Sequence, residues 1–211
     1  MLYRDPEMRV ILMDYISQEY ANEDYYVALE AQYASNDRRA DVLLINEYTH
    51  AFEIKSDVDS ISRLSEQMED YRRTFDYLTI VTTATHQKKV KKMLGQNDGL
   101  MLISDGKISI SKEAKINKRI SKKSLVSLCS KKALTGILGL PNSAYLQNEV
   151  EAIAEKKLSL MRLKEIAFAE LERRFKNRYK VFLEEACPPY RECDLSVLKS
   201  GDLLNLTLLA A

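Results

Sequence analysis

The fold is decided by residues 39–55, which read RADVLLINEYTHAFEIK. Two apolar stretches, residues 40–45 and 51–55, flank the polar residues 46–49, which have the composition of a turn between strands. Side chains alternate between the two faces of a strand, so Phe52 and Ile54 point one way. Glu53 and Lys55 point the other way. The stretch therefore predicts a hairpin whose second strand carries a carboxylate and an ammonium on one face.

The first strand of this hairpin is predicted to have an apolar face and a polar one. By alternation, the apolar face carries Ala40, Val42 and Leu44. The opposite face carries Arg39, Asp41 and Leu43. Pairing through the short turn brings Asp41 close to Glu53. Three ionisable groups, Asp41, Glu53 and Lys55, are then expected to meet beside the core.

The segments around the hairpin extend it into a layered structure. Asp5 as N-cap and Pro6 after it start a helix that runs to about residue 19, and residues 26–33 alternate like a strand. After the hairpin, apolar residues recur every three or four positions and predict an amphipathic helix that begins near residue 60, with Asp57 and Asp59 as its capping residues. These apolar residues are Ile61, Leu64, Met68, Tyr71 and Phe75.

Further along, residues 77–83 predict a buried strand, residues 86–94 a helix and residues 100–103 another strand. Asp105-Gly106 is a strong hairpin turn into residues 107–110. Beyond residue 120 the strand signals stop, and residues 124–140 and 145–185 have helical composition. The order predicts an α/β fold with a mixed central sheet flanked by helices over residues 1–112, and a helical C-terminal region over residues 113–211.

Length and composition limit the broad class of the protein. A chain of 211 residues, 45% of them hydrophobic, can fill one sizeable core. Its 32 basic and 31 acidic residues nearly cancel, so net charge neither demands nor excludes a polyanionic partner. No apolar run approaches the roughly 20 residues that span a bilayer, and residues 1–6 lack a signal-peptide pattern. We therefore expect a cytoplasmic protein without a membrane partner.

The predicted cluster suits phosphodiester hydrolysis. Carboxylates are the hard oxygen ligands that hold Mg²⁺ or Mn²⁺, and such a metal polarises a phosphate and activates water. A lysine adds a compact positive charge that orients the attacking water and stabilises charge on the phosphate oxygens. The alternative for Asp41, Glu53 and Lys55 is a cross-strand salt bridge on a solvated sheet face.

The same residues resemble a known group of enzymes. Asp41 followed by Glu53-Ile54-Lys55 resembles the motif of the PD-(D/E)xK phosphodiesterase superfamily, which includes restriction endonucleases. Gln67 and Tyr71 look like the QxxxY element of the branch similar to the RecB nuclease domain, lambda exonuclease and Cas4-type proteins. The resemblance covers roughly residues 5–110 and is closest to small, poorly characterised bacterial and phage proteins. Ala40 stands where the superfamily name has a proline, a position on which no chemistry depends.

The resemblance implies a restriction-endonuclease-like core and a Mg²⁺- or Mn²⁺-dependent deoxyribonuclease. It implies Asp41, Glu53 and Lys55 as catalytic residues, and Glu30 as a metal ligand together with Asp41 and Glu53. Gln67 and Tyr71 are implied to support the substrate. Arg39 either contacts phosphate or partners a carboxylate. Read without the resemblance, Glu30 is an exposed strand residue and Tyr71 a core residue of an amphipathic helix.

A basic segment follows the last predicted hairpin turn. Residues 107–132 contain many lysines and a single acid, Glu113. The segment is either a DNA-contacting surface or a solvated face. Besides Lys107, its basic residues are Lys112, Lys115, Lys118, Arg119, Lys122, Lys123, Lys131 and Lys132. The alternatives to a nuclease are an inert module of the same fold that binds nucleic acid or a protein, and a structural protein with chance salt bridges. The helical C-terminal region leaves homo-oligomerisation open.

Overall fold

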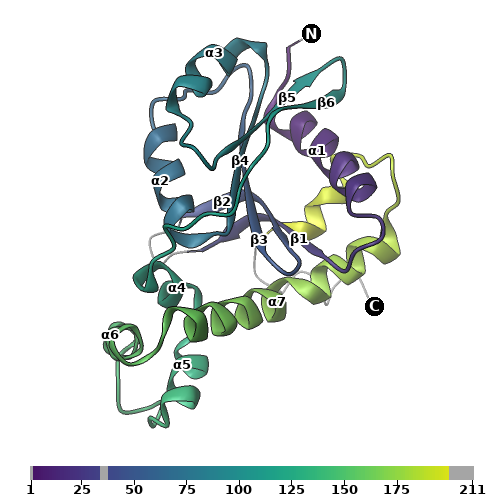
Figure 1. Cartoon of the computed structure of the whole chain (residues 1–211). Coiled ribbons are helices and arrows are strands. Elements are labelled where there is room, and N and C mark those ends of the chain that lie inside the picture. Colours follow the sequence, from purple (N-terminus) through teal and green to yellow (C-terminus); the bar gives the residue numbers. More distant parts are fainter. Residues whose placement is uncertain (1, 34–37, 200–211) are drawn as a thin grey trace.

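A six-stranded mixed sheet forms the centre of the protein, and the computed structural model describes it over residues 2–33 and 38–199 (Figure 1). The strands follow one another in space in their sequence order. Antiparallel pairs form at both ends of the sheet, and β3, β4 and β5 run parallel. The strands are β1 (Tyr26–Gln32), β2 (Arg39–Ile45), β3 (Thr49–Lys55), β4 (Tyr77–Thr82), β5 (Gly99–Ser104) and β6 (Lys107–Lys112). The predicted α/β class and the strand meander are confirmed.

Helices cover both faces of the sheet, as Figure 1 shows. One face packs against α1 (Asp5–Glu19), and the other against α2 (Leu64–Thr74) and α3 (Ala84–Met93). The predicted helical C-terminal region is also confirmed over the described residues. It consists of α4 (Lys122–Leu128), α5 (Lys131–Leu138), α6 (Gln147–Lys157), α7 (Leu160–Glu185) and the 3-10 helix η1 (Asp194–Leu198). None of the helices in the described part is long and apolar enough to cross a membrane.

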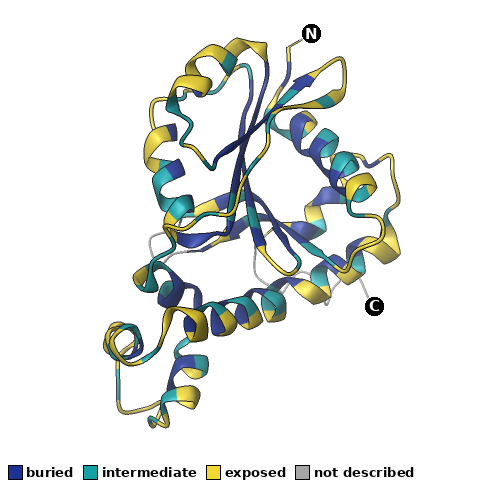
Figure 2. Ribbon diagram, viewed as in Figure 1, coloured by how far each residue is buried: buried dark blue, intermediate teal, exposed yellow. Residues whose placement is uncertain are grey.

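Two hydrophobic clusters lie on the two sides of the sheet, and the strands between them are the most buried part of the molecule (Figure 2). The α1 cluster contains Phe52 and Ile54, and the α2 cluster contains Leu43 and Ala51. Because α7 crosses the end of the sheet, its first half joins the α2 cluster, whereas Tyr179 and Phe182 join the α1 cluster.

The strand alternation holds in β3 but fails at the start of β2. Val42 and Leu44 pack in the α1 cluster as predicted, whereas Ala40 packs in the α2 cluster beside Ala31. Glu30 adopts a left-handed backbone conformation with φ 49°. This irregularity shifts the in–out alternation of side chains by one position, both at Glu30 in β1 and at the residue opposite it in β2. A strict period of two therefore places Ala40 on the wrong face of the sheet.

Two predicted helix starts need correction. Arg4, and not Asp5, is the N-cap of α1, while Asp5 is the first helical residue and holds the guanidinium of Arg9. Asp57 and Asp59 do not cap α2, which begins only at Leu64. Asp59 instead accepts hydrogen bonds from the main chain and the hydroxyl of Ser56. Short polar side chains after a strand satisfy the nearest free N–H groups, and here those belong to a loop.

The predicted Asp105-Gly106 turn is confirmed. Both residues have positive φ angles, 49° and 69°, and Ser104 pairs with Lys107 across the two-residue loop. A turn with positive φ at both central residues matches the twist of the flanking strands. Glycine adopts this left-handed conformation without the cost of about 1–2 kcal/mol that most other residues bear, and aspartate is one of the few others that tolerate it.

Candidate active site

The candidate site lies where β2 separates from β3. Pairing between these strands runs from Ile45 opposite Thr49 to Val42 opposite Phe52 and goes no further. The next opposed residues in this register are Asp41 and Glu53. The carboxylate of Asp41 accepts a hydrogen bond of 2.8 Å from the main-chain N–H of Ile54. The side chain of Asp41 thus supplies the hydrogen-bond acceptor that the main chain of β2 no longer offers to β3 at this position, because a buried N–H needs an acceptor.

Glu53 is the most enclosed acid of the site, with no exposed surface. Its Oε1 atom lies 2.6 Å from Nζ of Lys55, and its Oε2 atom accepts a hydrogen bond of 2.5 Å from the hydroxyl of Tyr71. Glu53 and Lys55 share one face of β3, as predicted, and Phe52 and Ile54 occupy the other. Removing a carboxylate and its cation from water costs free energy even when they are paired. Favourable packing in the rest of the protein must offset this cost.

Asp41 is held beside this buried acid. Burial and then the charge of Glu53 raise the pKa of Asp41 to about 8, against the opposing effects of the Ile54 N–H and of Arg9. Burial and the nearby carboxylates also raise the pKa of Tyr71 well above its usual value. The phenol therefore stays protonated and serves as a hydrogen-bond donor to Glu53. The two carboxylates repel each other unless a proton or a cation lies between them.

Arg9 of α1 belongs to the site, and it was not among the residues predicted from the sequence. Its guanidinium binds both carboxylate oxygens of Asp5 at 2.8 Å and Oε1 of Glu30 at 2.9 Å. A third carboxylate, that of Asp41, has its Oδ1 atom 3.9 Å from the Nη2 atom of Arg9. The one available signal was an arginine next to Met8 on the buried side of α1, where an unpaired charge would be costly.

Glu30, the predicted third metal ligand, lies opposite Asp41 in the register of β1 and β2. Its neighbours pair on either side, Leu29 with Val42 and Ala31 with Ala40. Both of its carboxylate oxygens face arginines, Arg9 at 2.9 Å and Arg39 at 3.5 Å. Glu30 is therefore close to the other acids in the sheet but turned toward guanidinium groups.

The predicted substrate residues occupy one side of the site. Tyr71 is buried, and its hydroxyl also lies 3.1 Å from the main-chain carbonyl of Arg39. Gln67 is one helical turn earlier on α2 and half-buried, and its side chain forms no hydrogen bond with any described residue. The side chain of Arg39 is 50% exposed and faces Glu30. The structure thus brings Tyr71 into contact with Glu53, while Gln67 and Arg39 lie at the solvent side.

The donor set is compatible with a divalent cation but does not enclose one. No group of three His, Cys, Asp or Glu side chains in residues 2–33 and 38–199 is arranged to hold a metal ion. Asp41 and Glu53 provide two adjacent carboxylates, and Mg²⁺ in proteins is commonly held by one or two carboxylates together with water and substrate phosphate. Their mutual repulsion is the physical feature that a cation would relieve.

The basic segment lies beside the outer side of α2. Arg119 binds Glu69 of α2 at 2.9 Å, and Nζ of Lys122 donates to the carbonyl of Glu155 at 3.3 Å. Four other lysines are exposed and form no ion pair with any described residue. They are Lys115, Lys118, Lys123 and Lys132.

Comparison with known proteins places the chain in a phage family. Protein cII of enterobacteria phage P4 is 27% identical over 185 residues, which cover 84% of this chain and 69% of that protein. A solved structure, the SPO1766 protein of unknown function from Silicibacter pomeroyi, aligns with 72% of this chain and 93% of that one. Its sequence identity is 13% and its TM-score 0.42. The family described as bacteriophage P4 protein cII matches residues 2–199, and the chain therefore belongs to that family.

Proposed function

We propose that this protein is a metal-dependent nuclease of the PD-(D/E)xK type, with a restriction-endonuclease-like core, that hydrolyses phosphodiester bonds of DNA. One observation carries the proposal. Asp41, Glu53 and Lys55 converge where β2 separates from β3, with Glu53 fully buried and its Oε1 atom 2.6 Å from Nζ of Lys55. A chain selected only for stability has no need of two adjacent carboxylates at this depth, because like charges destabilise the folded state.

Each side chain has a defined role in this proposal. Asp41 and Glu53 would hold Mg²⁺ or Mn²⁺, which supplies a Lewis acid for the phosphate and a more acidic water. Lys55 would present a positive charge to the attacking water and the phosphate oxygens. Tyr71 fixes the orientation of Glu53 through its short hydrogen bond. Glu30 stays a predicted third ligand, and it would have to release Arg9 to reach the metal.

The substrate would approach from the solvent side of α2. Gln67 is half-buried on this helix, the side chain of Arg39 is 50% exposed, and Arg119 of the basic segment binds Glu69 of the same helix. Lysines and arginines that neutralise phosphates release counterions, so binding through them weakens as salt rises. We expect DNA binding by this protein to fall steeply between low and physiological salt.

The proposal is tested by incubating the purified protein with labelled linear duplex, circular duplex and single-stranded DNA, in Mg²⁺, Mn²⁺ or EDTA. Lys55→Ala is compared with Lys180→Ala, which removes an exposed lysine of α7 and serves as the matched control. We expect metal-dependent cleavage that Lys55→Ala lowers by roughly 100-fold or more and that Lys180→Ala leaves unchanged.

A second readout separates the alternatives. Mg²⁺ or Mn²⁺ should raise the melting temperature of the wild type and not that of Asp41→Ala, because binding to the native state stabilises it. Absence of both cleavage and metal-dependent stabilisation would contradict the proposal. Binding of DNA without cleavage by any metal-loaded sample would instead favour the inert module.

A further inference from the structure

A cleft of about 820 Å³ opens on the α1 side of the sheet and is separate from the candidate active site. It lies between the C-terminal end of α1, the β2–β3 turn and the far end of β6. His50 and Phe52 form part of its floor, and on β3 they alternate with Ala51 and Glu53, which face α2. The two sites therefore occupy opposite faces of the same strand.

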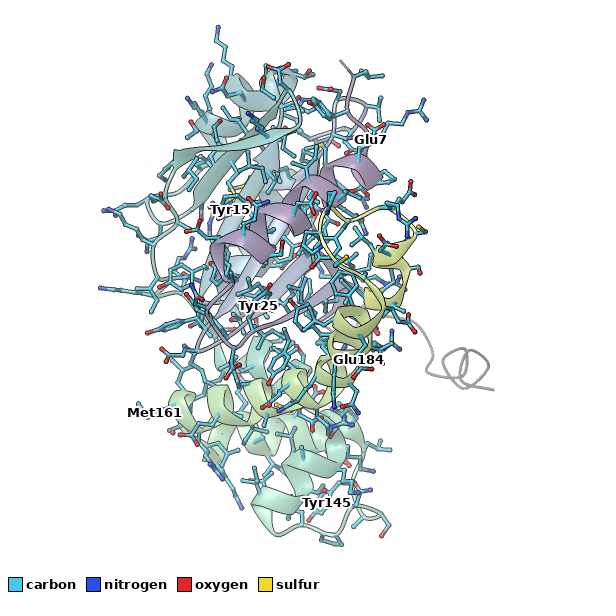
Figure 3. All side chains as sticks on the ribbon, turned by 90° about the vertical axis from the view of Figure 1, so that its right-hand side faces the viewer. Glu7, Tyr15, Tyr25, Tyr145, Met161 and Glu184 are labelled. Atoms are coloured by element: carbon cyan, nitrogen blue, oxygen red, sulfur yellow. The ribbon has the colours of Figure 1, made fainter. Side chains whose placement is uncertain are left out.

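Aromatic rings line this cleft. The imidazole of His50 stacks on the ring of Phe52 with centroids 4.0 Å apart, and Tyr77 lies 5.5 Å from His50. Tyr48 meets Tyr77 edge to face at 5.6 Å. Tyr15 and Tyr20 add two phenol rings from α1, and Figure 3 labels Tyr15 on that helix. The faces of such rings carry partial negative charge and attract cations.

The histidine in the floor is neutral. Burial lowers the pKa of His50 to about 3, and its Nε2 atom lies 2.8 Å from the hydroxyl of Thr79. An uncharged imidazole adds an aromatic surface without adding a positive charge. The floor of the cleft therefore does not repel a cation.

The rim of the cleft is acidic. Five exposed carboxylates line it against a single lysine, and none of the five forms a salt bridge with any residue in the described ranges. The lysine, Lys112, donates from Nζ to the carbonyl of Gly95 at 2.5 Å. The carboxylates are Glu19, Glu23, Asp24, Glu47 and Glu113.

Several of these acids act on the tyrosines of the cleft. Burial raises the pKa of Tyr15 and Tyr20, and the charges of Glu19 and Glu113 near Tyr15 and of Glu23 near Tyr20 raise it further. The potential at the rings is thus negative. An anion is disfavoured there, whereas a positive charge would gain from both the rings and the carboxylates.

We propose that this cleft binds an organic cation, an alkylammonium or guanidinium group, with its charge over the rings of Tyr48, Tyr77 and His50. The volume is in the range that encloses a small molecule or a long basic side chain. A small hydrated metal ion would make little use of aromatic walls, whereas a weakly hydrated organic cation exchanges water for ring faces at low cost. The proposal is independent of the nuclease function.

Agmatine, which carries a guanidinium and an ammonium group, is the first probe, and N-butylurea, which carries neither charge, is the neutral control; both are titrated into the full chain by calorimetry. With 12 tyrosines and no tryptophan, the tyrosine fluorescence of the chain gives a second signal. We expect saturable binding of agmatine with one ligand per chain and no saturable binding of N-butylurea. A short capped peptide with one arginine, titrated in parallel, distinguishes a free cation from a side chain of a partner, since the true source binds more tightly.

Two variants and two controls locate the site. Tyr48→Leu removes a ring that is 40% exposed, and Glu23→Gln with Glu47→Gln removes two rim charges without removing buried volume. Each is expected to weaken agmatine binding about fivefold or more. Tyr145→Leu and Glu184→Gln, which lie elsewhere in Figure 3, should leave it unchanged.

The proposal is overturned if agmatine and N-butylurea bind alike, if neither agmatine nor the peptide saturates, or if both cleft variants keep wild-type affinity. Circular dichroism of each variant confirms that it is folded. Because neither variant touches Asp41, Glu53 or Lys55, nuclease activity is read separately on the same samples.

Discussion

At the scale of single residues, the chemistry of the candidate site depends on two acids that share one small volume. Glu53 pairs with the charge of Lys55 and accepts a hydrogen bond from Tyr71, whereas among the described residues Asp41 has the Ile54 N–H within hydrogen-bond distance and a more distant Arg9. The pair is therefore asymmetric. Asp41 is the acid whose charge is least compensated, and its titration should be visible in the stability of the protein.

Protonation of Asp41 should make the stability of the folded protein depend on pH. Its pKa is raised to about 8 by burial and by Glu53, above the value of about 4 in the unfolded chain. Between these two values the folded state holds a proton that the unfolded state has released, so the stability is fully present below about pH 4 and is lost as pH rises to about 8. We expect the free energy of unfolding to fall from about pH 5 to about pH 8 and to level off above that, and to fall less in Asp41→Asn.

Urea unfolding in EDTA across this pH range measures the effect. One proton corresponds to at most about 1.4 kcal/mol per pH unit, and the 25% exposure of the Asp41 side chain makes a smaller slope the expected result. Asp105→Asn, at an exposed turn that tolerates asparagine, is the control. Equal slopes for the wild type and Asp41→Asn would refute this assignment.

At the scale of elements, periodicity predicts where strands and helices run, and backbone irregularities decide what their ends do. The left-handed conformation of Glu30 moves Ala31 and Ala40 to the α2 side, and it lets Glu30 face Arg9 on the α1 side. Nothing in a run of alternating residues reports such a reversal. The contact of Glu30 with Arg9 follows from this local backbone conformation.

Helix α5 provides a matched test of backbone conformation. Gly136 lies inside the helix and Gly139 is its C-cap with φ 65°, and a Cβ atom at either position would meet nothing within 4 Å. Gly136→Ala should raise the free energy of unfolding by about 0.5–1 kcal/mol, because alanine is the better helix former. Gly139→Ala should lower it by about 1 kcal/mol, because alanine is strained in the left-handed region.

Chemical denaturation of the two single variants and the wild type measures both effects. Since the added group is one methyl in each case and touches no neighbour, a difference in sign isolates the backbone. Two changes of the same sign would contradict the conformation assigned to α5.

At the scale of the whole molecule, α7 connects the two hydrophobic clusters. Leu163, Leu171 and Phe175 pack on the α2 side of the sheet, and Phe182 packs with Tyr190 on the α1 side. The chain then returns to the sheet, where Lys199 bridges to Leu29 of β1. The division at residue 112 stays a prediction, but buried side chains from both sides of that position share each cluster.

Loss of packing in α7 should therefore destabilise the whole chain. Phe182 is 1% exposed, and Phe182→Ala should cost about 3–5 kcal/mol. The neighbouring Leu183 is 54% exposed, so Leu183→Ala should change the free energy of unfolding by less than about 0.5 kcal/mol. We expect circular dichroism and tyrosine fluorescence to report one shared, lowered transition in Phe182→Ala. A sheet that melts at the wild-type temperature while α7 unfolds would disprove this coupling.

The sequence by itself determined the secondary structure and the polar face of β3. Alternation at period two located β1 to β3, apolar runs located β4 and β5, and Asp105-Gly106 located the last hairpin. Helical spacing located α1 and α2, although α2 begins about four residues later than expected. These features depend on local backbone preferences and on the burial of one face of each element. Both are determined by residues that are close together in the sequence. The shared face of Glu53 and Lys55 follows from the same rule.

Only the tertiary structure decided which groups surround those residues. Arg9 comes from α1 and Tyr71 from α2, and the Ile54 N–H is free for Asp41 only because β2 separates from β3. The acidic aromatic cleft likewise assembles side chains from α1, β3, β4 and the end of β6. Contacts between residues far apart in the chain depend on how whole elements pack, and a one-dimensional pattern carries no distance between them.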